Sequence, residues 1–498
     1  MQSTTAICPS LFNAAIAQDG ILSRIRIPCG IISRLQVKAI AHLVQQYGNP
    51  NSPHAVQITN RANLQIRSDR PLSLEMLHYL QVNGLAARDQ RLDGLRNIMT
   101  SPTAGIDPQA LIDPRPYAQQ WEDYLISHPE LAILSAKFSV CFDGGELVNV
   151  ADRPNDICLV AIAQNDIGVN PKIYFHLHLG IGDRGSSPTP TGILIEPSQA
   201  ITYLAAFTEI YREYTQQFLA NAGQHQLGKH PKPPRLRQLI KDWGIDSYHQ
   251  PLTTIPNHPL PITHYQSPIT NHPYNHLGIH PQKTSPNPNL QQSDLVYIGV
   301  VIPLGRLSIG QLMGLSQIAQ TYGSSSLRLT PWQNIIITDI PKNQVDLVVQ
   351  AIADLGLTIA TTDPYAAIVA CSGCTGCKSA HTDTQSDAQS IATHLHESRL
   401  LSQPINIHFS GCDKSCAQHY PSDIALVGIP SPERSLYRVY VGDRETHFGT
   451  ELYAEYAATD LPQLITELIS TYHTQSSKLN LHQNLPSFRE FANTLTHA

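Results

Sequence analysis

Five cysteines gather in one short part of the chain, and their spacing predicts a metal or cluster site. Cys371 and Cys377 are separated by five residues, Cys412 and Cys416 by three, and Cys374 lies within the first pair. Thiolates are soft ligands, and four of them suit a [4Fe–4S] cluster or a zinc ion. Structural zinc sites favour pairs with about two to four intervening residues. The wider first pair therefore favours a cluster.

The choice of four ligands depends on Cys374. Cys371, Cys374 and Cys377 also form a C-x2-C-x2-C run of the kind found in small ferredoxins. Such a run would be completed by a single remote cysteine, whereas here a Cys-x3-Cys pair follows. We therefore predict Cys371, Cys377, Cys412 and Cys416 as the metal ligands and Cys374 as the spare thiol.

The sequence segments expected to form the elements that position these cysteines occur twice in the chain, as an internal repeat. Residues 27–48, IPCGIISRLQVKAIAHLVQQYG, align with residues 302–323, IPLGRLSIGQLMGLSQIAQTYG, at a constant offset of 275. Ser33 and Ser308 precede apolar residues at helical spacing and are expected to be N-caps. A short strand-like run follows in each copy. Strand, helix and strand are therefore expected in each of these two units, A and A′.

A second unit is also repeated. Residues 138–145, FSVCFDGG, align with residues 405–412, INIHFSGC, at an offset of 267, and a second hydrophobic strand follows each at the same offset. The order of units is therefore A–B–A′–B′. Where B′ has Cys412 and Cys371, B has Gly145 and approximately Ser101. Only the second copy is expected to hold the metal.

The predicted boundaries follow from these repeats and from composition. Between the halves lies a stretch rich in Pro, His and Asn and nearly free of charge, which is typical of a linker. The predicted units are half-domain A (1–90), domain B (91–225), the linker (226–292), half-domain A′ (293–362), domain B′ (363–480) and a C-terminal tail (481–498).

Composition narrows the class of protein. The 498 residues carry a formal net charge of −6, which argues against a nucleic-acid partner. No apolar run approaches the roughly 18 residues that span a bilayer, and the N-terminus lacks the pattern of an export signal. A cytoplasmic protein without a membrane partner is expected.

Several sequence segments resemble motifs of the nitrite/sulfite reductase superfamily. They are the C-x5-C and C-x3-C pairs, NIMTSPTAG (97–105) and TNRANLQIR (59–67). The resemblance implies an internally duplicated α+β fold, with ferredoxin-like half-domains and two cluster/tetrapyrrole-type α+β domains in a pseudo-twofold arrangement. Within the superfamily, DGILSRIRIPCG (19–30), KFSVCFDGG (137–145) and HFSGCDKSCAQHYPSDIALVG (408–428) are most similar to precorrin-3B synthases.

Two departures from the reductases favour the same subfamily. The reductases generally have Pro-Asn after the third cysteine, where this chain has Asp413 and Lys414. Sulfite reductases also carry a basic R-K-F-K run, and here Ala136 and Ser139 replace two of its three basic residues. Both changes weaken the expectation of an anion-reducing site.

The resemblance to precorrin-3B synthases implies a monooxygenase of cobalamin biosynthesis. Such an enzyme hydroxylates the tetrapyrrole precorrin-3A at C20, with γ-lactone formation, using O2. The [4Fe–4S] cluster would supply electrons from NADH directly or through a ferredoxin or reductase, and a mononuclear non-haem iron could activate O2. The alternative is a siroheme-dependent ferredoxin nitrite or sulfite reductase. A third hypothesis is a non-catalytic protein braced by its metal.

A tetrapyrrole carries several carboxylates, which arginine binds in bidentate fashion. Basic residues in the segments that resemble the family are therefore expected to bind substrate, and two amides there could bind a substrate edge or cap a turn. In A′, Val301 and Trp332 replace two of the basic residues, which predicts one pocket instead of two. The predicted substrate-binding residues are Arg26, Arg61, Asn63, Gln65, Arg67 and Lys137. No catalytic residue is assigned.

Overall fold

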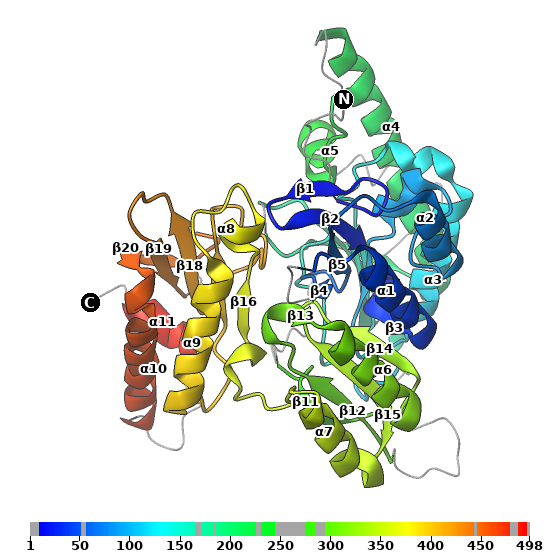
Figure 1. The fold of residues 1–498 in the computed structure, drawn as a ribbon. Coiled ribbons are helices and arrows are strands. Elements are labelled where there is room, and N and C mark those ends of the chain that lie inside the picture. The colour runs from blue at the N-terminus through cyan, green and yellow to red at the C-terminus, as the bar shows by residue number, and fades with distance from the viewer. Residues whose placement is uncertain are drawn as a thin grey trace.

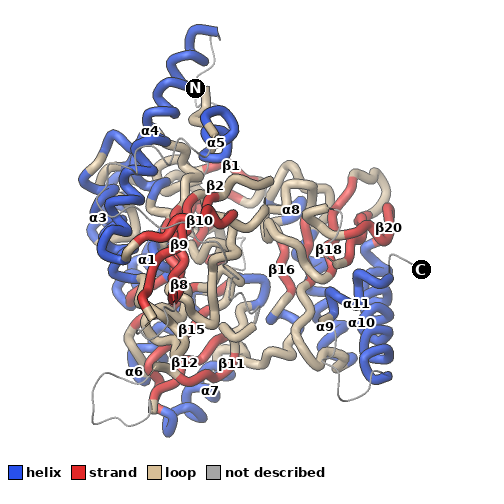
Figure 2. The backbone as a smooth tube through the Cα atoms, turned by 180° about the vertical axis from the view of Figure 1, so that it is seen from behind, coloured by secondary structure: helices blue, strands red, loops and turns tan. Residues whose placement is uncertain are grey.

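The computed structural model describes residues 9–50, 56–164, 171–183, 185–225, 231–244, 274–283, 294–442, 446–478 and 487–495. Within these residues the strands named below form four five-stranded sheets, one for each of A, B, A′ and B′. In Figure 1 the B′ domain, coloured yellow to red, lies to one side of the paired half-domains A and A′. Figure 2 views the molecule from behind, and from this side the sheet of B is visible. The duplicated α+β fold expected from the sequence is confirmed.

The sheet of half-domain A has the order β1-β2-β5-β4-β13, and its last strand comes from A′. Its strands are β1 (Ala15–Ala17), β2 (Gly20–Ile25), β5 (Leu64–Ser68), β4 (Val56–Ile58) and β13 (Arg306–Leu307). The sheet of A′ has the order β11-β12-β15-β14-β3, and its last strand comes from A. Its strands are β11 (Gly278–Pro281), β12 (Leu295–Val300), β15 (Ile335–Pro341), β14 (Ser326–Leu329) and β3 (Ile31–Ser33).

The two half-domains thus exchange a strand. Leu307 of β13 pairs with Val56 of β4, and Ile32 of β3 pairs with Leu327 of β14, both in antiparallel register. The exchanged side chains Ile32 and Leu307 are fully buried in one hydrophobic core that the two half-domains share. Because that core crosses the repeat, A and A′ form one structural unit.

Each exchanged strand leads into a capped helix. The helices of these two units are α1 (Arg34–Tyr47), α2 (Leu74–Val82), α6 (Ile309–Tyr322) and α7 (Val345–Asp354). Ser33 Oγ accepts a hydrogen bond from the Gln36 amide, and the Gln36 side chain accepts one from the Ser33 amide. Ser308 and Gln311 form the same capping box in α6. Both predicted N-caps are confirmed, and each contributes about 1 kcal/mol.

The sheets of B and B′ have the same topology, with two parallel pairings followed by two antiparallel ones. The strands of B are β6 (Ile98–Thr100), β7 (Val140–Asp143), β8 (Ile157–Gln164), β9 (Lys172–Leu179) and β10 (Thr189–Ile195). Those of B′ are β16 (Ile368–Ala370), β17 (Ile407–Ser410), β18 (Ile424–Ile429), β19 (Leu436–Val441) and β20 (Thr450–Ala457).

Helices cover these sheets. Domain B has α3 (Arg115–Ser127), α4 (Ala200–His225) and α5 (Leu236–Trp243). Domain B′ has α8 (Gly373–Gly376), α9 (Thr384–Ser398), α10 (Leu461–Lys478) and α11 (Phe488–Leu495). None of the helices in the described residues is long and apolar enough to cross a membrane.

Two expectations about irregular segments were wrong in part. The segment 226–292 contains α5 and the edge strand β11, which pairs with β12. The segment 481–498 contains α11, whose Phe488 and Phe491 are buried. Each of these elements spans eight residues or fewer, so the sequence offers few apolar positions from which a period could be recognised.

Candidate cluster and cofactor site

A cavity of about 380 Å³ lies between the sheet of half-domain A and the cysteine loops of B′. Cys371, Cys377, Cys412 and Cys416, the four predicted ligands, all line it. Cys374 does not line it: this thiol is exposed, and the Cys374 amide donates to the Thr382 carbonyl over 2.8 Å. The arrangement agrees with the choice of Cys374 as the spare thiol.

The first cysteine pair is held by a single helical turn after β16. Cys371 Sγ accepts hydrogen bonds from the Gly411 amide at 3.2 Å and the Gly373 amide at 3.5 Å. Amide donors of this kind stabilise a ligating thiolate and influence the potential of a cluster. Gly373 has φ +64, and a Cβ there would lie 2.9 Å from the Thr384 nitrogen, so the loop requires glycine.

The second pair follows β17. Ser410 Oγ donates to the Cys412 carbonyl over 2.6 Å, and Ser415 adopts a positive φ of 51° between the two cysteines. Lys414 Nζ donates to Ser379 Oγ over 2.7 Å and so connects the two cysteine loops. These contacts fix the backbone on both sides of the cavity.

The donor set suits a cluster better than a single ion. In the described parts of the chain, no three His, Cys, Asp or Glu side chains are placed so that they could hold one metal ion. The four thiols instead surround a cavity, as ligands of a multi-atom cluster do. For the same reason the described residues provide no ready ligand set for the mononuclear non-haem iron.

The opposite wall of the cavity is one face of three adjacent strands of half-domain A. Arg24 and Gln57 both pair with Gln65 across the sheet, so the three side chains lie side by side. Arg24 Nη2 donates to Gln65 Oε1 at 3.3 Å, and Gln65 Nε2 donates to Gln57 Oε1 at 3.0 Å. This wall presents cations and amides to the cysteines.

Arg67 joins this wall to the cysteine loop. Its Nε donates to Asp19 Oδ1 at 2.9 Å and its Nη2 donates to Ser372 Oγ at 3.0 Å. In the same region the Gln18 amide donates to the Gly376 carbonyl at 3.4 Å. Burial and the nearby Arg67 charge lower the pKa of Arg306, whose neighbours also include Asp19 and Cys371. A guanidinium pair therefore lies beside the first cysteine.

Gln65 and Arg67 are thus the predicted substrate residues that the structure brings to the cysteines. Sequence reasoning missed Arg24, Gln57 and Arg306. Arg24 could have been found, because it occupies the same face of β2 as Leu22, the partner of Arg67. Arg306 could not, because it reaches the site only through the strand exchange that pairs it with Gln57.

The other basic residues lie elsewhere. Arg61 donates from Nη1 to Asn155 Oδ1 at 2.8 Å and from Nη2 to the Pro154 carbonyl, and burial lowers its pKa to about 10. Arg26 lines a separate cavity of about 850 Å³ between A and B. Lys137 is exposed and lines neither cavity.

Asn63 supports the backbone. Its Oδ1 accepts from the Ile27 amide at 2.8 Å, and its side chain is buried. Asn334 accepts from the Ile302 amide at 2.9 Å in the other half. Because both half-domains make the same contact, the arrangement favours the structural alternative for Asn63, that of capping a turn.

Side chains occupy the region between B and A′ that corresponds to the cavity between B′ and A. The register of β6 with β7 and of β16 with β17 makes Ser101 the counterpart of Cys371 and Gly145 that of Cys412, as the sequence alignment predicts. Ile336, the counterpart of Gln65, packs with Tyr297 and Ile106.

Arg328 also occupies this region between A′ and B, since its Nη1 donates to the carbonyls of Pro102 and Ala104 at 3.0 and 2.7 Å. The A/B′ face, by contrast, combines the four closely spaced cysteines with an open cavity.

Comparison with known proteins places this fold and site in a family. The chain matches the nitrite and sulphite reductase 4Fe-4S domain over residues 92–255 and 361–484, more than half of its length. It matches the nitrite/sulfite reductase ferredoxin-like half domain over residues 16–75 and 289–355. The chain belongs to the nitrite and sulfite reductase family.

Its relatives are oxidoreductases named for these substrates. A ferredoxin–nitrite reductase of Synechococcus elongatus is 28% identical, covering 92% of this chain and 87% of the relative. A ferredoxin sulfite reductase of Mycolicibacterium paratuberculosis is 27% identical, covering 82% of this chain and 69% of the relative. The structure of the Mycobacterium tuberculosis NirA protein has the same fold, with a TM-score of 0.71, 22% identity and coverage of 96% and 84%. These names favour the reductase alternative over the precorrin-3B synthase expectation.

Proposed function

We propose that this protein is a siroheme- and [4Fe–4S]-dependent reductase of nitrite or sulfite that takes electrons from a ferredoxin. The observation that carries the proposal is one cavity in which four cysteines face a wall of cations and amides. The names of the relatives support the same reaction class.

The residues of the cavity suit a polycarboxylate macrocycle. Arg24, Arg67, Lys378 and Lys414 surround it, and a guanidinium binds a carboxylate through two parallel hydrogen bonds. Siroheme carries several carboxylates on its rim, and its iron supplies the centre at which an anion is reduced. In this proposal Cys371, Cys377, Cys412 and Cys416 hold the cluster, while Arg24, Gln65 and Arg67 orient the rim of the macrocycle.

The same residues explain how electrons would enter. Lys378 and Lys414 are exposed next to the cysteine loops, where an acidic donor protein would be attracted by charge. The relatives named for ferredoxin support a donor of this kind. Because the surface interaction is screened by salt, donor-dependent turnover should fall as ionic strength rises.

Anaerobic purification followed by cofactor extraction tests the proposal. We expect bound siroheme, about four irons per chain in the cluster as for a Cys₄ site, and reduction of nitrite or sulfite with reduced methyl viologen. A preparation that holds the cluster but no siroheme, and reduces neither anion, would contradict it.

A second candidate is the precorrin-3B synthase-like oxygenase, and one contact favours it. Ser139, which replaces a basic residue of sulfite reductases, donates to Asp156 Oδ2 at 3.2 Å, and this carboxylate is buried and paired with Arg235. At this position the chain therefore offers a hydroxyl bonded to a carboxylate, in place of the cation that would help to bind an anion. Oxygen-dependent change in the absorption of added precorrin-3A, without siroheme, would favour this candidate over the reductase.

A further inference from the structure

Helix α11 lies beyond the residues that match the family and packs firmly on domain B′. The match ends at residue 484, and α11 begins at Phe488. Phe488 and Phe491 are 3% and 4% exposed and pack with Tyr472 of α10, with ring centroids 5.3 and 5.5 Å from that ring. A helix of eight residues is marginal on its own, so this packing holds it.

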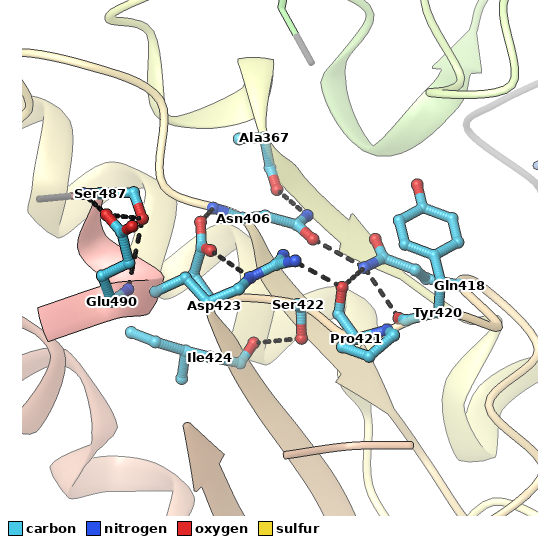
Figure 3. A network of polar contacts seen from close by, with 11 residues as sticks. Ala367, Asn406, Gln418, Tyr420, Pro421, Ser422, Asp423, Ile424, Ser487 and Glu490 are labelled. Carbon is cyan, nitrogen blue, oxygen red and sulfur yellow. Dashed lines mark hydrogen bonds and ion pairs between the residues drawn. The ribbon is translucent and has the colours of Figure 1, made fainter. Parts of the chain in front are cut away.

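One cation of α11 reaches back to the segment that follows the second cysteine pair. Arg489 Nε donates to Asp423 Oδ1 at 3.2 Å, and its Nη2 donates to the Pro421 carbonyl at 3.2 Å. Asp423 is mostly buried, with a side chain 14% exposed, which strengthens the ion pair relative to one in water. Figure 3 shows Asp423 and Pro421, the two residues that accept these hydrogen bonds.

The network continues from Asp423 to the cysteine loop. Asp423 Oδ2 accepts from the Asn406 amide at 2.8 Å, and Asn406 Oδ1 accepts from Gln418 Nε2 at 2.6 Å. The Gln418 carbonyl in turn accepts a hydrogen bond from Ser415 Oγ. Ser415 lies between Cys412 and Cys416 in the sequence, so the chain of contacts ends inside the ligand loop.

Gln418 also fixes the segment on the other side of the loop. Its Nε2 donates to the Tyr420 and Pro421 carbonyls at 3.2 and 3.3 Å. Pro421 is thus held from one side by Gln418 and from the other by Arg489. The Asn406 side chain adds a contact to the Ala367 carbonyl, just before the strand that leads to Cys371.

We propose that Arg489 is a positioning residue for the cluster: through Asp423, Asn406 and Gln418 it holds the Cys412–Cys416 loop in the conformation that binds iron. The inference rests on the cluster placed in the cavity above and is independent of the substrate. It gives the C-terminal helix a function in retaining and adjusting the cluster.

Glu490, the next residue, provides a matched control. Its Oε2 accepts from the Ser487 amide at 2.7 Å and the Ser487 hydroxyl at 3.0 Å, so it stabilises the start of α11 without touching the network. Both Glu490→Gln and Arg489→Gln remove one charge from the first turn of the same helix. Only Arg489→Gln removes the connection to the cysteine loop.

The experiment compares wild type, Arg489→Gln, Arg489→Lys and Glu490→Gln as anaerobically purified full-length proteins. We expect Arg489→Gln to lose iron to a chelator about tenfold faster or more. The substitution removes charged hydrogen bonds, which are stronger than hydrogen bonds between neutral groups. Its reduced-cluster EPR spectrum and midpoint potential should also shift. Arg489→Lys should restore part of the wild-type rate, and Glu490→Gln should differ from wild type by less than about twofold.

Three outcomes would overturn the inference: no change in Arg489→Gln, an equal change in Glu490→Gln, or faster iron loss without any change in EPR spectrum or potential. Should Arg489→Gln fail to fold, Asp423→Asn tests the same connection from the other side and should give the same shifts. A wild-type protein that binds no cluster would instead contradict the cluster placement, so the two failures are distinguishable.

Discussion

The Arg67 guanidinium donates a hydrogen bond to the Ser372 hydroxyl over 3.0 Å, although 305 positions separate the two residues in the chain. Ser372 follows the first ligating cysteine, and Arg67 ends a row of polar side chains on the sheet of half-domain A. The contact therefore fixes the distance between the two walls of the cavity.

Replacing Arg67 should weaken binding of the tetrapyrrole. Arg67→Ala removes a cation from the cavity and its bonds to Asp19 and Ser372, so we expect siroheme to bind about ten- to hundredfold more weakly. Absorption titration of the apoprotein measures this affinity. Arg70→Ala is the control, because Arg70 is exposed and contacts Asp69 and Gln46 away from the cavity. Equal affinity in both variants would contradict the assigned role.

The cysteines differ in their expected effect on the cluster. Cys412→Ser removes a thiolate that faces the cavity, and the EPR signal of the reduced cluster should be lost. Cys374→Ser changes an exposed thiol outside the cavity, and the signal should remain. Loss of the signal in the Cys374 variant would mean that Cys374 is one of the four ligands.

Asn63 and its counterpart Asn334 should be equally important for stability. Each removal leaves a buried backbone amide, that of Ile27 or Ile302, without its acceptor. We expect Asn63→Ala and Asn334→Ala each to lower the free energy of unfolding by about 1–3 kcal/mol. Chemical denaturation measures the loss. If Asn63→Ala alone also weakened tetrapyrrole binding, Asn63 would have the substrate role that its sequence context favours.

The buried histidine pair of domain B should make stability depend on pH. Burial lowers the pKa of His178 to about 3 and that of His176 to about 4, and the two rings are hydrogen-bonded at 3.2 Å. Protons then bind the unfolded chain more readily, so stability is full above pH 6.5 and is lost as the pH falls toward the folded-state values.

Because the pKa of His178 is lower in the folded than in the unfolded protein, the free energy of unfolding should fall by about 2 kcal/mol between pH 7.5 and pH 5. His178→Phe should flatten the slope of unfolding free energy against pH in that range, whatever its effect at neutral pH. An unchanged slope would show that the pair does not titrate on unfolding.

The repeat was predictable because it rests on local residue identity. Ser33 and Ser308 each begin a capped helix, and the strand registers of B and B′ reproduce the alignment that pairs Cys371 with Ser101. The gathering of Cys371, Cys377, Cys412 and Cys416 around one cavity follows from the same kind of signal, since two closely spaced pairs of thiols are typical of metal and cluster sites. Their role as the four cluster ligands stays a prediction.

Contacts between residues far apart in the chain could not be predicted from the sequence. Arg61 lies in the same segment, 59–67, as Gln65 and Arg67, and Arg26 directly follows β2, which pairs with β5. Yet Arg61 is bound to Asn155 and Arg26 lines a different cavity. A residue type shows what a side chain can bind, whereas the direction in which it extends depends on the tertiary packing. The exchanged strand β13 has two residues, too few for any periodic signal.

The strand exchange has a consequence for dividing the protein. A polypeptide ending after α5 would keep β3 but lose the β14 edge that β3 pairs with, and its own sheet would lack β13. Each fragment would expose an unpaired edge and an uncovered apolar face, which favours aggregation. Produced together, the fragments should reassemble by complementation, because each carries the strand that completes the sheet of the other.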